Sequence, residues 1–295
     1  MRRRRPSVQG LAPLFGLVVL VALVILVSSP THRAFYLGIG AERLPTRPFP
    51  LPPLPGLMRT DVPVMAPVAV KRRMLSPDAE GKLLVPVADE IPSRLPAPGV
   101  PKGWEVKEFA GKADVELVRA EGGAAIRLRS DATSFLLYRD VVVDVERAPM
   151  LSWSWKAVRL PSRGDVRHGP TDDQAAQLYV VFPRWPAATL NSDVVGYVWD
   201  TTAPVGSVVT SAKAPNVKII VVESGTAQVG SWVHYQRNVH DDYVTLFKTR
   251  PPRVGMVAFM TDANDTSSAA EAWMGEVQFA PRALDGRKSP TSMLR

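Results

Sequence analysis

Residues 150–156 read MLSWSWK and residues 273–279 read WMGEVQF. In the first stretch, Leu151, Trp153 and Trp155 occupy alternate positions, with serines and a lysine between and after them. The second stretch alternates with the same period of two. Successive side chains of a β-strand point to opposite faces, so this pattern places one face of each strand in a core. Both stretches therefore predict strands of a layered β-structure.

Short runs of β-branched and aromatic residues recur from residue 104 onward, separated by Gly, Pro, Asp and Asn. The predicted strands are residues 115–119, 124–129, 134–139, 141–145, 150–156, 176–182, 194–199, 217–223, 232–238, 254–261 and 270–279. One short helix is predicted at residues 241–247, with Asp241 or Asp242 as its N-cap. Many short strands without alternating helices predict an all-β domain over residues 104–281, a jelly-roll-like antiparallel β-sandwich.

The N-terminus combines four arginines at positions 2–5 with an uncharged apolar run at residues 11–27. As a helix this run spans about 25 Å, close to the roughly 30 Å of a bilayer core. We predict a signal-anchor within residues 1–30 that holds the chain in the inner membrane. The alternative is a cleaved signal peptide, although residues 27–30, VSSP, form a poor cleavage site. In both cases the arginines stay in the cytoplasm and the remainder is periplasmic.

A proline-rich spacer is predicted over residues 31–103, because residues 45–101 contain 14 prolines. Proline removes a backbone donor, so this stretch favours an extended polyproline tether. A proline-motif ligand for a protein partner is the alternative. Residues 282–295 are predicted to be a disordered basic tail.

Charge is distributed unevenly between these segments. The chain carries a net charge of +8, but residues 104–281 contain 18 Lys and Arg against 21 Asp and Glu, a net of −3. An acidic domain argues against nucleic acid as its ligand. The absence of cysteine excludes disulfides, thiol nucleophiles, cysteine-ligated zinc and iron–sulfur clusters.

Several sequence blocks occur in an order that resembles a known bacterial family. They are LSWSWK at 151–156, DD at 172–173, LYVVF at 178–182, YVW at 197–199, VVESG at 221–225, RNV at 237–239, MTDANDT at 260–266 and AWMGE at 272–276. Over about residues 104–280 the chain resembles the family called domain of unknown function 3047. The resemblance implies a secreted β-rich domain similar in general appearance to jelly-roll carbohydrate-binding modules, and it implies no activity.

Aromatic residues supply the first candidate ligand site, because sugar rings stack on flat aromatic faces. Trp185 lies in a Pro-Arg-Trp-Pro turn, which makes it hard to bury. Tyr197 and Trp199 share one face of a predicted strand, so they are predicted either to bind ligand or to lie in the core. For Trp153 and Trp155 the core is favoured, since they share a face with a leucine.

Carboxylates supply the second candidate. Asp172 and Asp173 enter a predicted strand and are included among the ligand-binding residues. Adjacent residues of an extended chain point in opposite directions, so they do not form an acid–base pair. A distant partner such as Asp200 or Glu223 would be needed, and nothing selects one; turn hydrogen bonds or an arginine partner are the structural alternative. No catalytic residue is therefore assigned.

The loop Asp262-Ala-Asn264-Asp265 is rich in oxygen ligands, so calcium is the one cofactor that the sequence suggests. An Asx turn explains the same residues. The loop reads TDANDT where the family resemblance suggests a tighter Thr-Asp-x-Asp-Asn-Thr, which weighs against a metal role. Arg237 is predicted either to contact ligand or to pair with Asp172 or Asp262. The histidines lack zinc-site spacing, so zinc is not expected.

The sequence is compatible with three functions. The first is an exported, membrane-tethered binding module whose ligand is a saccharide or another cell-envelope polymer. The second is an enzyme that acts on such a polymer. The third is a scaffold for an envelope protein complex, which recruits its partners through the proline-rich segment.

Overall fold

The computed structural model describes residues 74–184 and 192–282. The predicted membrane segment at 11–27, the spacer up to residue 73, Trp185 and the tail after residue 282 lie outside the described residues. Within those two ranges, no helix is both long enough and apolar enough to cross a membrane.

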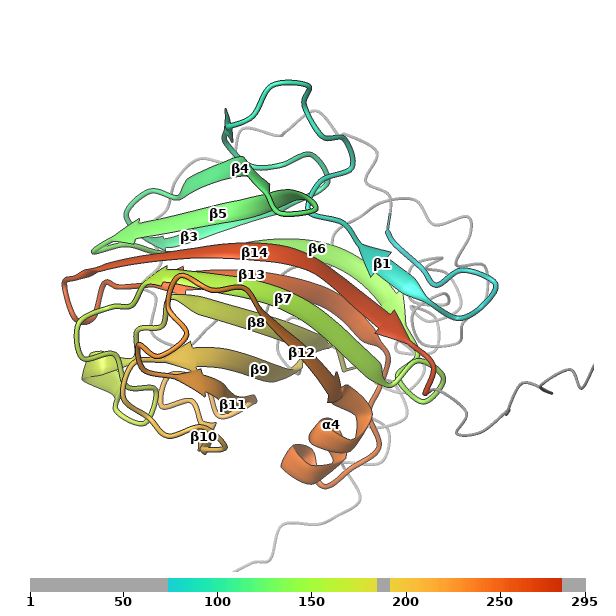
Figure 1. The fold of residues 1–295 in the computed structure, drawn as a ribbon. Coiled ribbons are helices and arrows are strands. Elements are labelled where there is room, and N and C mark those ends of the chain that lie inside the picture. Colours follow the sequence, from blue (N-terminus) through green and yellow to red (C-terminus); the bar gives the residue numbers. More distant parts are fainter. Residues whose placement is uncertain (1–73, 185–191, 283–295) are drawn as a thin grey trace, which may run out of the picture.

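Two sheets of seven strands each face one another in a sandwich-like arrangement (Figure 1). The first sheet runs β12-β7-β14-β5-β4-β2, with β1 paired to β14. Its strands are β1 (Leu83–Val85), β2 (Ala97–Pro98), β4 (Asp114–Ala120), β5 (Gly123–Asp131), β7 (Met150–Arg159), β12 (Val233–Asn238) and β14 (Ala269–Ala280). All pairings within this sheet are antiparallel.

The second sheet runs β10-β11-β9-β8-β13-β6-β3. Its strands are β3 (Glu105–Ala110), β6 (Ser134–Val143), β8 (Ala176–Phe182), β9 (Asp193–Asp200), β10 (Val208–Thr210), β11 (Val217–Ser224) and β13 (Val254–Asp262). Here β11 and β9 pair in parallel and the other neighbours pair antiparallel. A 3₁₀ turn, Gly169–Thr171, precedes β8.

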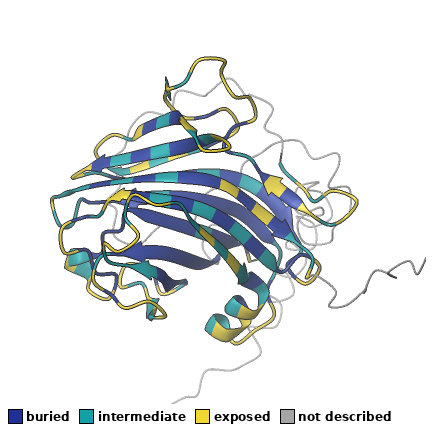
Figure 2. Ribbon diagram, viewed as in Figure 1, coloured by how far each residue is buried: buried dark blue, intermediate teal, exposed yellow. Residues whose placement is uncertain are grey.

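The core lies between the two sheets and follows from the period-two pattern. Along β7, Leu151, Trp153 and Trp155 are buried while the residues between them are not. Phe279 of β14 and Phe259 of β13 reach the same core from opposite sheets. Figure 2 shows this alternation as bands of buried and less buried residues along the strands. The all-β, two-sheet prediction is therefore confirmed.

The bounds of one predicted strand pair and of the predicted helix need correction. Residues 134–139 and 141–145 are predicted as two strands, but one strand, β6, runs unbroken from Ser134 to Val143, because nothing at residue 140 turns the chain. The helix α4 (Val239–Phe247) begins two residues before the predicted 241. Its N-cap is Asn238, whose side chain accepts a hydrogen bond from the backbone of Asp241 at 3.1 Å, rather than either aspartate.

The sandwich includes part of the segment assigned to the spacer. Leu83 and Val85 of β1 are buried in the core, and Leu83 lies opposite Phe279 of β14. Trp104 stacks on Phe259 with ring centroids 5.0 Å apart, and its indole N–H donates to the carbonyl of Pro86 at 3.1 Å. These contacts bind the described end of the proline-rich segment to the domain.

Candidate functional site

A cleft of about 350 Å³ lies on the outer face of the second sheet, the face turned away from the core. Strand β13 forms its centre, since Met256, Ala258, Met260 and Asp262 occupy alternate positions and all four line it. The cleft is lined by Lys107, Phe109, Ala110, Ser134, Leu136, Asp172, Gln174, Gln177, Tyr179, Val181, Val194, Ser211, Lys213, Ala214, Val217, Ile219, Met256, Ala258, Met260, Asp262, Asn264 and Asp265.

The floor of the cleft contains one tyrosine ring, Tyr179, flanked by small residues. Tyr179 lies opposite Ala258 on one neighbouring strand and opposite Gly196 on the other. A Cβ at Gly196 would come within 2.7 Å of the Tyr179 ring. Only glycine leaves that space, so the ring spreads over β9. The Tyr179 hydroxyl donates to Gln177 Oε1 at 2.6 Å.

One end of the cleft is polar and is built from three loops. Lys213 Nζ lies 2.6 Å from Asp265 Oδ2 and 3.9 Å from Asp172 Oδ2. Gln174 donates to Asp172 Oδ1 at 3.3 Å. Burial raises the pKa of Asp172 to about 6, with the Lys213 ammonium acting in the opposite direction. A carboxyl with this pKa titrates near neutral pH.

Asp262, the last of the four alternating β13 residues that line the cleft, lies at the same polar end. It is only 4% exposed, and its Oδ1 has no hydrogen-bond partner among the described residues. Burial raises the pKa of Asp262 well above its usual range, and the neighbouring carboxyl of Asp173 raises it further. The polar end thus contains two carboxyls, Asp172 and Asp262, that hold protons more strongly than free aspartates do.

Asp173 is fully buried and has a structural role. Its two carboxylate oxygens accept the backbone N–H groups of Asp265 and Thr266, at 3.1 and 2.6 Å. These bonds fix the loop between β13 and β14. Asp172 and Asp173 point in different directions, as the sequence pattern predicts, and only Asp172 lines the cleft.

Asp172 makes the stability of the domain depend on pH. Its pKa is about 6 in the folded protein against 3.8 as the ordinary value. The folded state therefore binds more protons than the unfolded state between about pH 4 and 6, so the free energy of unfolding falls as pH rises through that window. We expect the wild type to lose about 2–3 kcal/mol more than Asp172→Asn between pH 4 and 7. Urea unfolding at both pH values measures this, and equal losses would contradict it.

Tyr197 and Trp199 occupy the core and not the cleft. Both are 0% exposed. Tyr197 packs 5.0 Å from Trp153 between ring centroids, and the Trp199 indole N–H donates to the Gly225 carbonyl at 3.0 Å. The structure decides between the two readings of these residues in favour of the core and corrects their inclusion among ligand contacts. The physical reason is the register of β9, which turns its odd-numbered residues inward.

Arg237 pairs within its own segment. It donates to both oxygens of Asp242 in α4, at 2.6 and 3.0 Å, and the Tyr197 hydroxyl donates to the same carboxylate at 2.8 Å. This network docks the helix onto the sheet. The alternatives of a ligand contact or a pair with Asp172 or Asp262 are not what the geometry shows.

The loop residues proposed for calcium lie at the cleft. Asp262, Asn264 and Asp265 all line its polar end. Lys213 occupies the space beside Asp265, and Asn264 donates to Asp265 at 2.9 Å. Within residues 74–184 and 192–282, no group of three or more His, Asp or Glu side chains is arranged to hold a metal ion.

Asp200, a candidate partner carboxylate, is fully buried and organises loops. It accepts backbone N–H groups from Val166 at 2.8 Å, Thr202 at 2.8 Å and Ala203 at 2.6 Å. We expect Asp200→Ala to lower the free energy of unfolding by about 2–4 kcal/mol, because three backbone donors, of which those of Val166 and Ala203 are buried, lose their acceptor. Urea unfolding measures the loss. A loss below about 1 kcal/mol would show that water satisfies these donors.

Sequence reasoning missed Tyr179, Gly196 and Lys213. In residues 176–182 every position is apolar or aromatic except Gln177, so the pattern does not say which face meets the core. Gly196 within the apolar run 194–199 is the one usable signal, because glycine in a strand marks a close approach of another group. Lys213 lies in a loop, where no strand or helix periodicity predicts which way its side chain points.

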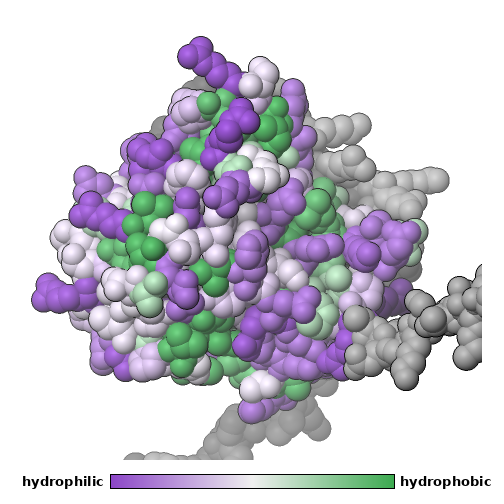
Figure 3. All heavy atoms as spheres, viewed as in Figure 1, coloured by the Kyte–Doolittle hydropathy of each residue, from purple (hydrophilic) through white to green (hydrophobic). Residues whose placement is uncertain are grey.

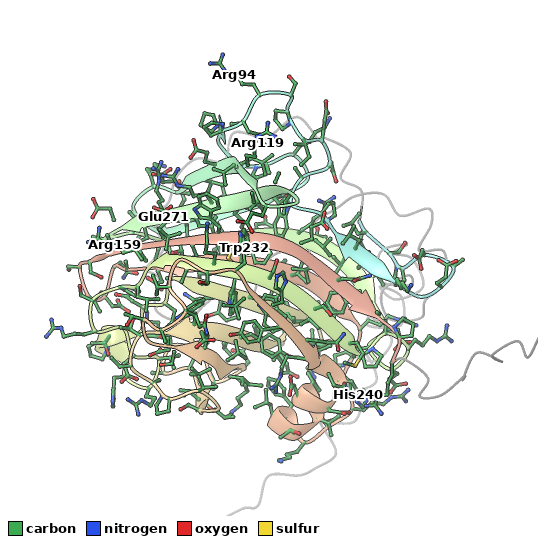
Figure 4. The ribbon with its side chains drawn as sticks, viewed as in Figure 1. Arg94, Arg119, Arg159, Trp232, His240 and Glu271 are labelled. Carbon is green, nitrogen blue, oxygen red and sulfur yellow. The ribbon has the colours of Figure 1, made fainter. Side chains whose placement is uncertain are left out.

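Two strands of the first sheet form a second aromatic surface on the opposite side of the molecule. Lys156 of β7 places its Nζ 3.8 Å from the ring centroid of Trp273 and 5.7 Å from that of Trp232. Trp232 is labelled on this side in Figure 4. Figure 3 shows the same side, where small apolar areas are separated by polar side chains.

The model of the family described as "Protein of unknown function (DUF3047)" matches residues 102–278. The chain belongs to the DUF3047 family. The match spans all strands from β3 to β13 and most of β14, so the cleft lies within the DUF3047 domain. A search of curated proteins finds no match.

Solved structures similar to the DUF3047 domain include the glycoside hydrolase domain of Endo-D from Streptococcus pneumoniae R6, at 11% identity over 61% of this chain and 22% of that chain, with a TM-score of 0.32. Another is endoglucanase Cel12A from Rhodothermus marinus, at 11% identity over 63% of this chain and 100% of that chain, with a TM-score of 0.38. A third is the family 30 carbohydrate-binding module of a Clostridium thermocellum cellulase, at 10% identity over 68% and 99%, with a TM-score of 0.34. Values this low support no inference about ligand or activity.

Proposed function

We propose that the protein is an exported, membrane-tethered binding module with a jelly-roll-like sandwich, and that it binds a saccharide in the cleft on the outer face of the second sheet. The single observation that carries this proposal is the composition of the cleft, which has an apolar floor and a polar end. A sugar ring has the same division, because its C–H face is apolar and its edge carries hydroxyl groups.

The residues of the cleft match such a ligand in kind. The Tyr179 ring and the Met256 and Met260 side chains provide apolar surface under a ring. Gln174 and Asn264 offer both donors and acceptors to hydroxyl groups, which also suits a neutral, polyhydroxylated molecule. A volume of about 350 Å³ is within the range of small-ligand sites.

Export and tethering are supported by the sequence of the N-terminus, with its arginines before the apolar run at 11–27. In this arrangement the described domain is periplasmic. The proline-rich stretch between membrane and domain gives the cleft access to polymers of the cell envelope.

A glycan array probed with the full-length chain tests the binding function. The chain is purified in a detergent that contains no sugar, because a glycosidic detergent would compete for the cleft. We expect a restricted set of glycans to bind, with the signal lost in Tyr179→Ala and kept in Trp273→Ala. Uniform absence of binding would overturn the proposal.

The second candidate is an enzyme that acts on an envelope polysaccharide. It is favoured by Asp172 and Asp262, two cleft carboxyls with raised pKa. Incubation of the bound glycan with wild type and Asp172→Asn, followed by an assay for new reducing ends, separates the two functions. Cleavage that Asp172→Asn abolishes would establish catalysis, and intact glycan after prolonged incubation would leave binding alone.

A further inference from the structure

The polar end of the cleft contains more carboxyls than it needs for its own structure. Asp172, Asp262 and Asp265 line it, and Asp173 lies directly behind Asp262. One ammonium, that of Lys213, acts on the three that line the cleft. The other lysine of the cleft, Lys107, comes from the edge strand β3.

The four carboxyls differ in how well they are partnered. Asp173 accepts two backbone N–H groups, Asp265 pairs with Lys213, and Asp172 accepts from Gln174. Asp262 is only 4% exposed, yet its Oδ1 has no hydrogen-bond partner among the described residues. A buried acceptor without a donor is costly, and a bound donor would remove that cost.

Asp262, the residue with the unpartnered oxygen, lies where a ligand on the floor would meet it. Met256, Ala258, Met260 and Asp262 form one column along the outer face of β13. A molecule seated on the apolar part of this column ends at Asp262. The group that suits this position is a donor, and the excess of carboxyls favours a positively charged one.

We propose that the cleft recognises an amino sugar, and that the ligand's ammonium group binds the carboxyl group of Asp262 with Asp172 beside it. This inference rests on the proposed saccharide-binding function and names its ligand class. An ammonium group supplies three donors and offsets part of the carboxyl excess, which a hydroxyl group of a neutral sugar does not.

Protonation gives this recognition a measurable signature. Burial raises the pKa of both Asp172 and Asp262, with Asp173 and Asp265 adding to the effect and Lys213 opposing it. A bound cation favours the ionised carboxyls and so lowers their pKa. Near pH 5 the amines of the sugar are already protonated, so binding of an amino sugar there releases protons from the carboxyls, whereas binding of a neutral sugar does not.

The test uses the full-length chain and three hexasaccharides: a β-1,4-linked glucosamine hexamer, its fully N-acetylated form and the corresponding glucose hexamer. Isothermal titration near pH 5, in two buffers of different ionisation enthalpy, measures affinity and proton release. We expect the glucosamine hexamer to bind at least tenfold more tightly than the other two, with net proton release. Asp262→Asn should remove this preference, and Asp172→Asn should weaken it if the first variant does not fold.

Glu276→Gln is the matched control, because it removes one carboxylate from an exposed position on the first sheet. It should leave the preference intact. Equal affinity for all three hexamers, or an unchanged preference in Asp262→Asn, would overturn the inference about the amine and leave saccharide binding standing. A flat glycan array would instead overturn the proposed function itself.

Discussion

Replacing Trp199 by alanine should lower the free energy of unfolding by about 3–5 kcal/mol, among the largest single-residue effects expected in this domain. The Trp199 side chain is 0% exposed and belongs to the core cluster between the sheets. Its removal leaves a cavity and deprives the Gly225 carbonyl of the indole N–H that it accepts at 3.0 Å. Urea unfolding followed by circular dichroism gives the change as a shift of the midpoint.

Trp199→Phe separates packing from ligand binding. Phenylalanine fills most of the space but cannot donate to Gly225, so we expect a smaller loss of about 1–2 kcal/mol. Because the residue does not line the cleft, the folded Trp199→Phe protein should bind saccharide with wild-type affinity. A stable variant that has lost saccharide binding would instead return Trp199 to the ligand contacts.

Filling the cleft from its floor should abolish binding. Ala258 lies on β13 opposite Tyr138 on one side and Tyr179 on the other, and its side chain grows into the cleft when enlarged. We expect Ala258→Trp to weaken saccharide binding at least a hundredfold, equivalent to about 2.7 kcal/mol. Titration of the strongest glycan from the array measures this effect.

Two further variants serve as controls for this prediction. Ala258→Ser adds almost no volume and should bind like the wild type. If Ala258→Trp does not fold, Gly196→Ala tests the same floor, because the added Cβ comes within 2.7 Å of the Tyr179 ring and forces that ring to move. Wild-type affinity in a folded Ala258→Trp protein would exclude this cleft as the binding site.

The sandwich could be predicted from the sequence because β7 and β14 carry strict alternation, which has one physical explanation. The strands β1, β2 and β3 could not. β1 and β2 are short and lie beside prolines, and all three strands form because partners distant in sequence, such as β14 for β1, complete their hydrogen bonds. Pairing between distant segments leaves no local pattern.

The site was harder to predict because the second sheet is covered on both faces near β9. The run 193–200 is buried at every position, so its residues read as equally suited to the core and to a ligand face. For this reason the sequence leaves Tyr197 and Trp199 open between a ligand contact and the core, and it does not single out Tyr179. The sequence marks Asp172 and Asp262 as oxygen-bearing residues, but they meet Lys213 only because segments distant in sequence come together in the fold.

Methionine methyl NMR tests the central claim most directly, since the cleft floor contains its own probes. Met256 and Met260 line the cleft, whereas Met274 is buried in the core and Met150 begins β7. Titrating the bound glycan into chain labelled at its methionine methyl groups should shift the Met256 and Met260 signals and leave those of Met274 and Met150 in place. Binding that shifts Met274 or Met150 and leaves the Met256 and Met260 signals unmoved would contradict the account.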